Sequence, residues 1–210
     1  MSPRYNFLPL PGQEGGQGDG RPDLSGFNTL LERGRSLGVN ATMSSYHLFQ
    51  SPMGWVGLMG ADKGLSRLTI KPTPQETMEE LDPGLLGASH DPDAFPQAQG
   101  CLDKYFRGDV KALDGIPLDL TWAPPFFRAA WAACRQIPPG ETRSYAWLAA
   151  QAGSPRAVRA AGQAMARNPL ALVIPCHRVI ASNGDLRGYG AGGLEVKARL
   201  LALEGASRGK

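Results

Sequence analysis

The chain has 210 residues and a mass of 22.4 kDa; 42% of its residues are hydrophobic and 20% are charged. That length predicts one large domain or two small ones, and no apolar stretch of about 18 residues indicates a membrane-spanning helix. Residues 121–210 hold 12 Lys and Arg against 4 Asp and Glu, a net charge of +8, whereas the whole chain carries only +3. This asymmetry indicates either contact with a polyanion through the C-terminal half or a basic surface that only aids solubility.

Three cysteines, Cys101, Cys134 and Cys176, are spread along the chain without any CxxC spacing. This sparse, odd set argues against a disulfide framework and against a cysteine-based zinc site. The first 22 residues lack the basic and then apolar pattern of a secretory signal. We therefore expect a cytoplasmic protein with no metal site.

The N-terminal part divides into a flexible leader, residues 1–40, and a small α/β domain, residues 41–120. Three short apolar runs in residues 44–70, separated by turn residues, predict a short antiparallel sheet. Residues 73–82 and 91–109 predict helices, the first with Thr73 as its cap and Pro74 at its first position. Residues 113–122 predict a final strand that closes this domain.

Residues 121–210 predict a mostly helical C-terminal domain. Residues 124–140 place Phe127, Ala130, Trp131 and Cys134 on one apolar face, so we interpret Cys134 as core packing, and Cys101 likewise. Two short helices, residues 142–153 and 155–168, are joined by a tight turn in which Ser154 and Pro155 cap the second helix. This pair predicts a helix-turn-helix.

The second helix of this pair has the composition of a nucleic-acid element. An inward stripe is predicted for Val158, Ala161 and Met165. Long polar side chains line the other side, namely Arg156, Arg159, Gln163 and Arg167, with small residues between them, namely Ala157, Ala160, Gly162 and Ala164. A small-residue face flanked by arginines can approach a duplex closely. The alternative is an alanine-rich helix that packs against a neighbour and leaves its arginines in solvent.

The segment VIPCHRVI places Cys176 beside His177, directly after Pro175. A free thiol has a pKa of about 8.5, so it needs a base or a positive charge to act as a nucleophile. Adjacent side chains of an extended segment point to opposite faces, so a bridging water or a turn at Pro175 would have to link the two groups. Glu204 is a candidate to orient the histidine, or it is an ordinary solvated charge.

The segment NPLALVIPCHRVI resembles the active-site segment of the O6-alkylguanine-DNA alkyltransferases, also called methylated-DNA–protein-cysteine methyltransferases. The resemblance extends over residues 124–205 and, more loosely, over residues 44–120. It implies a fold of the α+β or α/β class. A ribonuclease-H-like N-terminal domain with a short antiparallel sheet would precede a winged-helix-like C-terminal domain with a helix-turn-helix.

The resemblance also implies an activity: irreversible, single-turnover transfer of a methyl or other alkyl group from O6-alkylguanine in duplex DNA to Cys176. O4-alkylthymine would be a second substrate, and a monomer would act without a cofactor. His177 would be the base, through a water, and Glu204 would orient it. Asn168 would brace the active-site turn, and Tyr189 would donate its phenol to N3 of guanine.

The remaining roles that the resemblance implies concern DNA and the base pocket. O6 of a paired guanine is inaccessible to a buried thiol, so the nucleotide must rotate out of the helix. Tyr145 would press on the target phosphate, and Arg159 would enter the stack in place of the base. Further DNA contacts are expected from Arg156, Gln163, Ala160 and Gly162. The substrate pocket would be formed by Pro175, Val179, Gly190 and Ala191.

Three alternatives remain at this point. A lesion sensor on the same scaffold would bind DNA without transfer, but such proteins carry another residue where this chain has Cys176. A cysteine hydrolase using Cys176 and His177 would turn over repeatedly without DNA. A helix-turn-helix regulator would bind a specific DNA sequence, yet the alanine-rich helix offers few side chains for reading bases.

Overall fold

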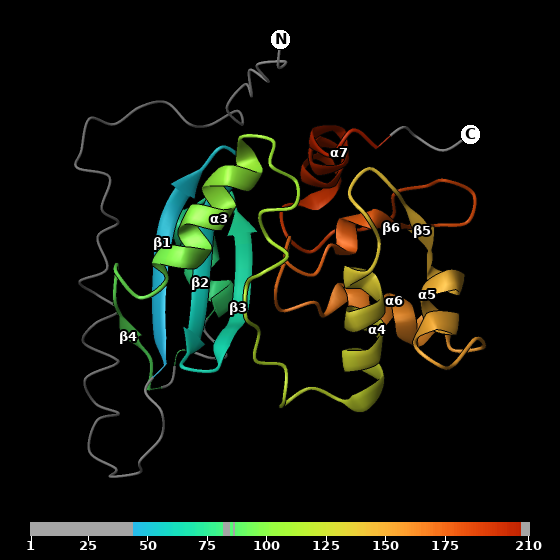
Figure 1. The fold of residues 1–210 in the computed structure, drawn as a ribbon, viewed down its shortest axis with the longest axis horizontal. Helices are drawn as coiled ribbons and strands as arrows, with labels where there is room; N and C mark the ends of the chain where they lie inside the picture. The colour runs from blue at the N-terminus through green and yellow to red at the C-terminus, as the bar shows by residue number, and fades with distance from the viewer. Residues whose placement is uncertain (1–43, 82–84, 86, 207–210) are drawn as a thin grey trace.

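The structure, a computed structural model, describes residues 44–81, 85 and 87–206. A sheet with its helices forms the N-terminal domain, and a cluster of helices beside it forms the C-terminal domain (Figure 1). The predicted leader, residues 1–40, lies outside the described residues. Among the described residues, no helix has both the length and the apolar character needed to cross a bilayer.

The three predicted strands are confirmed as β1 (Ser45–Ser51), β2 (Gly54–Ala61) and β3 (Gly64–Lys71), which pair antiparallel. A fourth strand, β4 (Ser89–His90), was not predicted; it pairs parallel with β1, so the strand order is β3-β2-β1-β4. A strand of two residues is too short to show an alternation of apolar and polar residues in the sequence, which is why β4 was missed. In this strand order, β3 lies at one edge of the sheet.

Helices α2 (Pro74–Leu81) and α3 (Pro96–Phe106) bury the sheet and confirm the predicted helices. Thr73 caps α2 as predicted, because its Oγ1 accepts the Glu76 amide at 3.2 Å. One core cluster joins α2 to Tyr46, Leu48 and Met59, and a second joins α3 to the other side chains of the sheet. The sheet thus separates two apolar layers.

The strand predicted over residues 113–122 is wrong. This stretch forms turns, and only Leu118 makes an isolated bridge, parallel to Leu65. The Leu65 amide donates to the Pro117 carbonyl at 2.9 Å, and the Leu65 carbonyl accepts the Asp119 amide. Pro117 itself has no N–H to donate, which limits the pairing to this point.

The C-terminal domain contains α4 (Pro125–Arg135), α5 (Tyr145–Gln151), α6 (Val158–Ala166) and α7 (Gly193–Leu203). Two short strands, β5 (Arg143–Ser144) and β6 (Val179–Ile180), pair parallel. Cys134 is fully buried on α4, as predicted, and Cys101 is half-buried against the core. The helices of this domain hold the segment that contains Cys176 between α6 and α7.

The predicted start of α6 is wrong by three residues. Ser154 and Pro155 lie in the turn, and the helix begins at Val158 after Ala157. The predicted inward stripe is also corrected: Val158 is 38% exposed, whereas Ala164 is buried with Ala161 and Met165. Contact with α4 includes a hydrogen bond from Trp131 Nε1 to the Ala164 carbonyl at 2.8 Å. That contact lies in the C-terminal half of α6, and Val158 in the first turn stays outside it.

The free edge of β3 receives the segment that follows α6. The Leu68 amide donates to the Pro169 carbonyl at 2.7 Å, and the Ala171 amide donates to the Leu68 carbonyl at 2.9 Å. One apolar cluster continues across both domains. The N-terminal sheet therefore supports the loop that leads to Cys176.

Candidate active site

Asn168 closes the loop that positions Cys176. Its Nδ2 donates to the Ile174 carbonyl at 2.8 Å and to Cys176 Sγ at 3.0 Å, while Oδ1 accepts the Leu170 amide at 3.0 Å. Within this loop, Leu172 has a positive φ of 68°, a conformation that costs a non-glycine residue roughly 1 kcal/mol or more. The amide of Asn168 thus holds a strained turn and also reaches the sulfur.

Cys176 is the first residue of a short 3-10 helix, η2 (Cys176–Arg178), that follows Pro175. The residue is 8% exposed, and burial raises the pKa of its thiol, although the Asn168 hydrogen bond and the Lys197 ammonium act in the opposite direction. The thiol is therefore protonated near neutral pH. It can act as a nucleophile only if a neighbouring base accepts its proton.

His177 lies beside the thiol with no solvent exposure. Its Nε2 is 2.9 Å from Glu204 Oε1. Because an ionised carboxylate only accepts hydrogen bonds, Nε2 carries the proton and Nδ1 keeps the lone pair of the neutral ring. Within the described residues, Nδ1 is buried and has no hydrogen-bond partner. Burial, together with the charges of Arg178 and Lys197, lowers the pKa of His177 more than Glu204 raises it, so the ring is neutral at pH 7 and can accept a proton.

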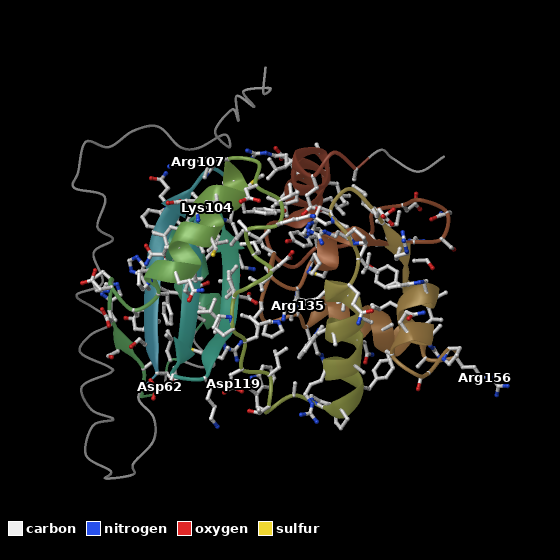
Figure 2. All side chains as sticks on the ribbon, in the orientation of Figure 1. Asp62, Lys104, Arg107, Asp119, Arg135 and Arg156 are labelled. Atoms are coloured by element: carbon white, nitrogen blue, oxygen red, sulfur yellow. The ribbon has the colours of Figure 1, made fainter. Side chains whose placement is uncertain are left out.

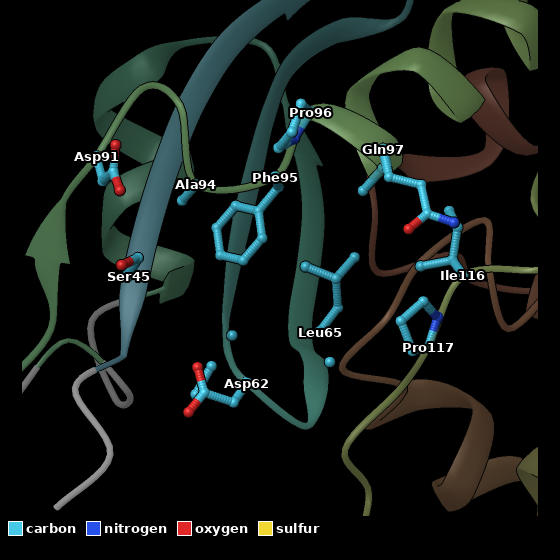
Figure 3. Close-up of a pocket in the computed structure, with 14 residues that line it drawn as sticks. Ser45, Asp62, Leu65, Asp91, Ala94, Phe95, Pro96, Gln97, Ile116 and Pro117 are labelled. Carbon is cyan, nitrogen blue, oxygen red and sulfur yellow. The ribbon is translucent and has the colours of Figure 1, made fainter.

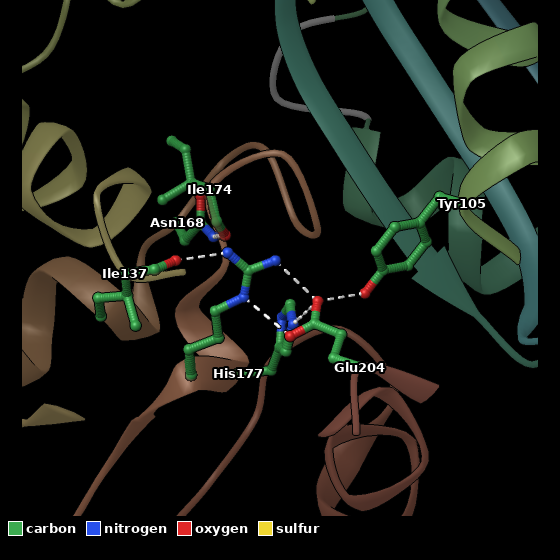
Figure 4. Close-up of polar contacts among 7 residues, drawn as sticks. Tyr105, Ile137, Asn168, Ile174, His177 and Glu204 are labelled. Carbon is green, nitrogen blue, oxygen red and sulfur yellow. Dashed lines mark hydrogen bonds and ion pairs between the residues drawn. The ribbon is translucent and has the colours of Figure 1, made fainter. Parts of the chain in front are cut away.

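Glu204 is buried at the end of α7 and accepts four hydrogen bonds (Figure 4). Besides His177, Arg178 donates from Nε to Oε2 and from Nη2 to Oε1, both at 2.8 Å, and the Tyr105 hydroxyl donates to Oε1 at 2.7 Å. Burial alone would raise the pKa of Glu204, but His177 and Arg178 outweigh it and hold that pKa at about 2. Glu204 is a buried anion, so the alternative of a solvated charge is wrong.

Cys176 also borders two cavities. The larger, of about 440 Å³, is lined by Tyr145, Gly162, Met165, Ala166, Cys176, Gly188, Tyr189 and Gly190. Small-molecule sites in proteins have volumes of roughly 300–1,000 Å³, so this cavity has room for a planar base. The smaller, of about 50 Å³, lies where β3 meets Asn168 and Ala191. The structure therefore brings Tyr145, Gly162, Tyr189 and Gly190 together beside the sulfur.

Tyr189 lines the larger cavity and also contacts His177. Its ring lies edge-on to the His177 ring, with centroids 6.3 Å apart. In the described part of the chain its hydroxyl is buried without a hydrogen-bond partner. Burial raises the pKa of this phenol well above its usual value, so the hydroxyl keeps its proton. The Tyr189 hydroxyl is therefore free to donate a hydrogen bond to a ligand in the cavity that Cys176 also lines.

Two of the expected pocket residues do not line either cavity beside Cys176. Pro175 precedes the 3-10 helix, and the Val179 amide donates to the Cys176 carbonyl. The Val179 carbonyl accepts Lys197 Nζ at 2.8 Å. Both backbone groups of Val179 are thus occupied within the protein.

The outer face of α6 carries the residues expected to contact DNA. Arg159 and Gln163 are exposed, and Ala160 and Gly162 are half-buried. Arg156 extends into solvent from the turn before the helix (Figure 2). The same helix supplies Gly162 to the cavity beside Cys176. The exposed basic face and the sulfur are therefore connected through one helix.

A family model described as the DNA-binding domain of 6-O-methylguanine DNA methyltransferase matches residues 125–206. A second, described as the ribonuclease-like domain of the same enzyme, matches residues 45–120. A methylated-DNA–protein-cysteine methyltransferase of Mycolicibacterium paratuberculosis is 44% identical over 77% of this chain and 93% of its own length. The chain belongs to the methylated-DNA–protein-cysteine methyltransferase family. It is thus a DNA-repair methyltransferase with a DNA-binding domain.

Other members of the methyltransferase family are similar over the same span. A relative from Cricetulus griseus is 40% identical over 76% of this chain and 81% of its own length. The crystal structure of Mycobacterium tuberculosis OGT in complex with DNA has a TM-score of 0.66 and 37% identity, covering 77% of this chain and 92% of that one. The resemblance that the motif around Cys176 predicted is confirmed, together with the division into an N-terminal sheet and a helical C-terminal domain.

A third cavity, of about 430 Å³, lies in the ribonuclease-like domain (Figure 3). Ser45, Asp62, Phe95 and Gln97 are among its lining residues, and none of the residues predicted for the methyltransferase site reaches it. Nowhere in the described part of the chain do three His, Cys, Asp or Glu side chains gather so that they could hold a metal ion.

Sequence reasoning missed two partners of Glu204, Arg178 and Tyr105. Arg178 follows His177 directly, and a charged residue inside an otherwise apolar run was a signal that it pairs with a buried anion. Tyr105 gave no such signal, because the helical spacing of residues 91–109 accounts for it as a core aromatic.

Proposed function

We propose that this protein repairs duplex DNA by transferring a methyl or other small alkyl group from O6 of guanine to Sγ of Cys176, once per molecule. The observation that carries the proposal is a buried sulfur on the wall of a cavity of about 440 Å³, with a neutral histidine beside it. The cavity is lined by residues of α6, the helix that also presents the exposed Arg159. A relative's crystal structure in complex with DNA supports DNA as the partner.

The chemistry balances without a cofactor. The Cys176 proton passes through a water to His177 Nδ1, and the thiolate attacks the alkyl carbon in line with the C–O6 bond. The S–C bond forms, the C–O6 bond breaks, and its electron pair stays on the purine. Tyr189 donates its phenolic hydrogen bond to N3, which stabilises the departing purine anion until it regains a proton. The thioether is inert, so the molecule is used once.

Asn168, His177 and Glu204 act on the sulfur without touching the alkyl group. Asn168 stabilises the developing thiolate through its 3.0 Å contact with Sγ. Glu204 fixes the tautomer of His177 and stabilises the imidazolium that forms. Because burial keeps the resting thiol protonated, we expect it to become nucleophilic only when a substrate carbon is in place.

The DNA side requires the target nucleotide to leave the stack. Helices α5 and α6 would act as a helix-turn-helix of a winged-helix-like domain, with the small face of α6, Ala160 and Gly162, in the minor groove. Arg159 would fill the vacated stack, and Tyr145, which lines the cavity, would press on the target phosphate. Arg156 and Gln163 would hold the backbone without reading sequence. Gly190 and Ala191 would shape the base pocket, whereas Pro175 and Val179 line neither cavity beside Cys176.

The proposal also includes the location, oligomeric state, second substrate and domain bounds expected from the sequence. The protein acts as a cytoplasmic monomer without a cofactor, and O4-alkylthymine is its second substrate. Residues 41–120 form the N-terminal domain and residues 121–210 the DNA-binding and transfer domain.

Mass spectrometry after incubation with an O6-methylguanine duplex tests the proposal. We expect a gain of one CH₂ unit on the peptide that contains Cys176, with one methyl per protein at saturation. Cys176→Ala abolishes the gain while DNA binding persists, and Cys101→Ala is the matched control that retains it. Lesion binding without transfer, or repeated turnover on an ester without DNA, would overturn the proposal in favour of a sensor or a hydrolase.

A further inference from the structure

Among the described residues, Leu68, Lys71 and Tyr105 make polar contacts from the N-terminal domain to the segments around Cys176 and His177. The Leu68 backbone pairs with the segment after α6, and Lys71 Nζ donates to the Gly190 carbonyl at 3.1 Å. The third contact joins Tyr105 of α3 to Glu204, 99 residues later in the chain. Among these three, only the Tyr105 contact involves a residue that is itself hydrogen-bonded to His177. It is therefore the shortest route from this domain to the base.

Tyr105 is a fixed donor. The side chain has no solvent exposure, and its ring packs edge-on against Phe106 with centroids 5.7 Å apart. Its hydroxyl lies 2.7 Å from Glu204 Oε1 (Figure 4). Burial and the neighbouring Glu204 carboxylate raise the pKa of Tyr105 well above its usual value. The phenol therefore keeps its proton and donates throughout the working pH range of the protein.

We propose that Tyr105 is a positioning residue for alkyl transfer, which holds the Glu204 carboxylate and thereby keeps His177 a neutral, correctly oriented base. The proposal rests on the function proposed above. Oε1 of Glu204 accepts from three donors, His177, Arg178 and Tyr105. Each donor withdraws negative charge from that oxygen, so each weakens its pull on the proton of His177 Nε2. Without the phenol, Oε1 would stabilise the imidazolium more strongly and raise the pKa of His177.

The other groups that face His177 come from the C-terminal domain. They are Lys197 of α7, Glu204 directly after α7, the adjacent Cys176 and Arg178, and Tyr189 of the loop before α7. The charges of Arg178 and Lys197 lower the pKa of His177, and Glu204 raises it. Replacing Tyr105 by Phe leaves all of these charges in place. A changed titration of His177 in that variant would therefore report the lost hydrogen bond.

The test compares Tyr105→Phe with Tyr46→Phe in the full chain. Tyr46 is the matched control, because its hydroxyl is also buried in the N-terminal domain but, within the described residues, lacks a hydrogen-bond partner. The single-turnover rate on an O6-methylguanine duplex is measured from about pH 5.5 to pH 9. In Tyr105→Phe we expect the acid limb to move up by about half to one pH unit, giving roughly 3- to 10-fold slower transfer at pH values low enough to protonate His177 and rates within about 2-fold at pH 8.5. Tyr46→Phe should follow the parent.

Two further measurements decide the result even if transfer is slow. NMR of the imidazoles follows His177 directly, because the chain has only three histidines and His47 and His90 can be removed by substitution. Fluorotyrosine at position 105 keeps the packing but donates a stronger hydrogen bond, so it should lower the pKa of His177, opposite to Tyr105→Phe. An unmoved His177 titration in both variants overturns the proposal, and so does a loss of rate that is equal at every pH. A parent protein that transfers no methyl group contradicts the proposed function instead, while the NMR titration still tests Tyr105.

Discussion

The two domains differ in the polar groups that they bury. Among its described residues, the C-terminal domain buries four side chains of acidic or basic residues, His177, Arg178, Lys197 and Glu204, and they lie around Cys176. In the described part of the N-terminal domain the buried polar groups are hydroxyls, namely those of Ser51, Thr69 and Thr77 and the phenols of Tyr46 and Tyr105. Ser51 and Thr77 donate to backbone carbonyls within four residues of themselves. Burying a charge lowers the free energy of unfolding unless the charge is paired. The concentration of such groups in the C-terminal domain therefore indicates that they are retained there for the reaction.

The largest effect expected from this contrast is loss of stability in acid. Glu204 has a folded pKa of about 2, below its ordinary value of 4.5, so it stabilises the fold above pH 4.5 and that stability disappears as the pH falls towards 2. A depression of that size corresponds to about 3 kcal/mol for this fully buried carboxylate. His177 has the same sign, because its lowered pKa makes the unfolded chain the better proton acceptor below pH 6.5.

Urea unfolding at about pH 7, pH 5 and pH 3 measures this loss. Glu204→Gln should flatten the decline below pH 4.5, whereas Glu195→Gln, an exposed residue on the same helix, should not. An equal decline in the parent and in Glu204→Gln would mean that groups other than Glu204 cause the loss of stability in acid.

Glu204→Gln should also slow methyl transfer by about 100-fold, because a neutral amide cannot stabilise the imidazolium and leaves Arg178 buried without its anion. Single-turnover kinetics at pH 8 measure the rate. Glu195→Gln again serves as the control and should transfer at the parent rate. A loss of less than about threefold would show that His177 works without its carboxylate.

These site residues separate what the sequence predicts from what it cannot predict. The resemblance carried by the segment around Cys176 implied that Glu204 orients His177, the cap Thr73 and Pro74 indicated α2, and helical spacing predicted α3 and α4. Tyr105 could not be assigned, because its single polar atom matters only through a tertiary contact across 99 residues. The strand at residues 113–122 failed for a related reason: a run of apolar residues does not reveal that only one of them meets the edge of β3. The three-residue error at the start of α6 arose because a Ser-Pro turn can precede a helix as well as begin it.

Gly162 offers a way to close the cavity without unfolding the domain. A Cβ built on this residue meets no atom within 4 Å, and the residue lines the cavity beside Cys176. Gly162→Leu should therefore keep the melting temperature and slow transfer from a duplex by about 30-fold, since the side chain occupies the space for the base and for close approach of DNA. Gly153→Leu is no substitute control, because its φ of 81° would strain the backbone. Ala150→Leu on the exposed face of α5 is a suitable one.

Arg159→Ala should have a smaller effect, about 10-fold, and only on duplex substrate. The guanidinium is exposed on α6 and is proposed to fill the stack, so its loss penalises rotation of the nucleotide and not the chemistry. The free alkylated base needs no rotation and should react at the parent rate. Equal losses on the two substrates would contradict extrusion by this residue.

The smallest effect is expected in the N-terminal sheet, and it should change stability alone. A Cβ on Gly57 would lie 2.7 Å from Thr77 Cγ2 and 2.9 Å from Leu81 Cδ1, so β2 and α2 would have to separate slightly. Gly57→Ala should lower the free energy of unfolding by about 1 kcal/mol and leave the transfer rate of the folded protein unchanged.

Gly100 is the matched control for Gly57. It lies inside α3, and a Cβ there meets nothing within 4 Å. Gly100→Ala should therefore stabilise the protein, by up to about 1 kcal/mol, because alanine has a higher helix propensity than glycine. Chemical denaturation and single-turnover kinetics on both variants complete the comparison. If Gly57→Ala slowed transfer in fully folded protein, the layer between α2 and the sheet would also control the active site. The influence of the N-terminal domain would then extend beyond the contacts made by β3 and Tyr105.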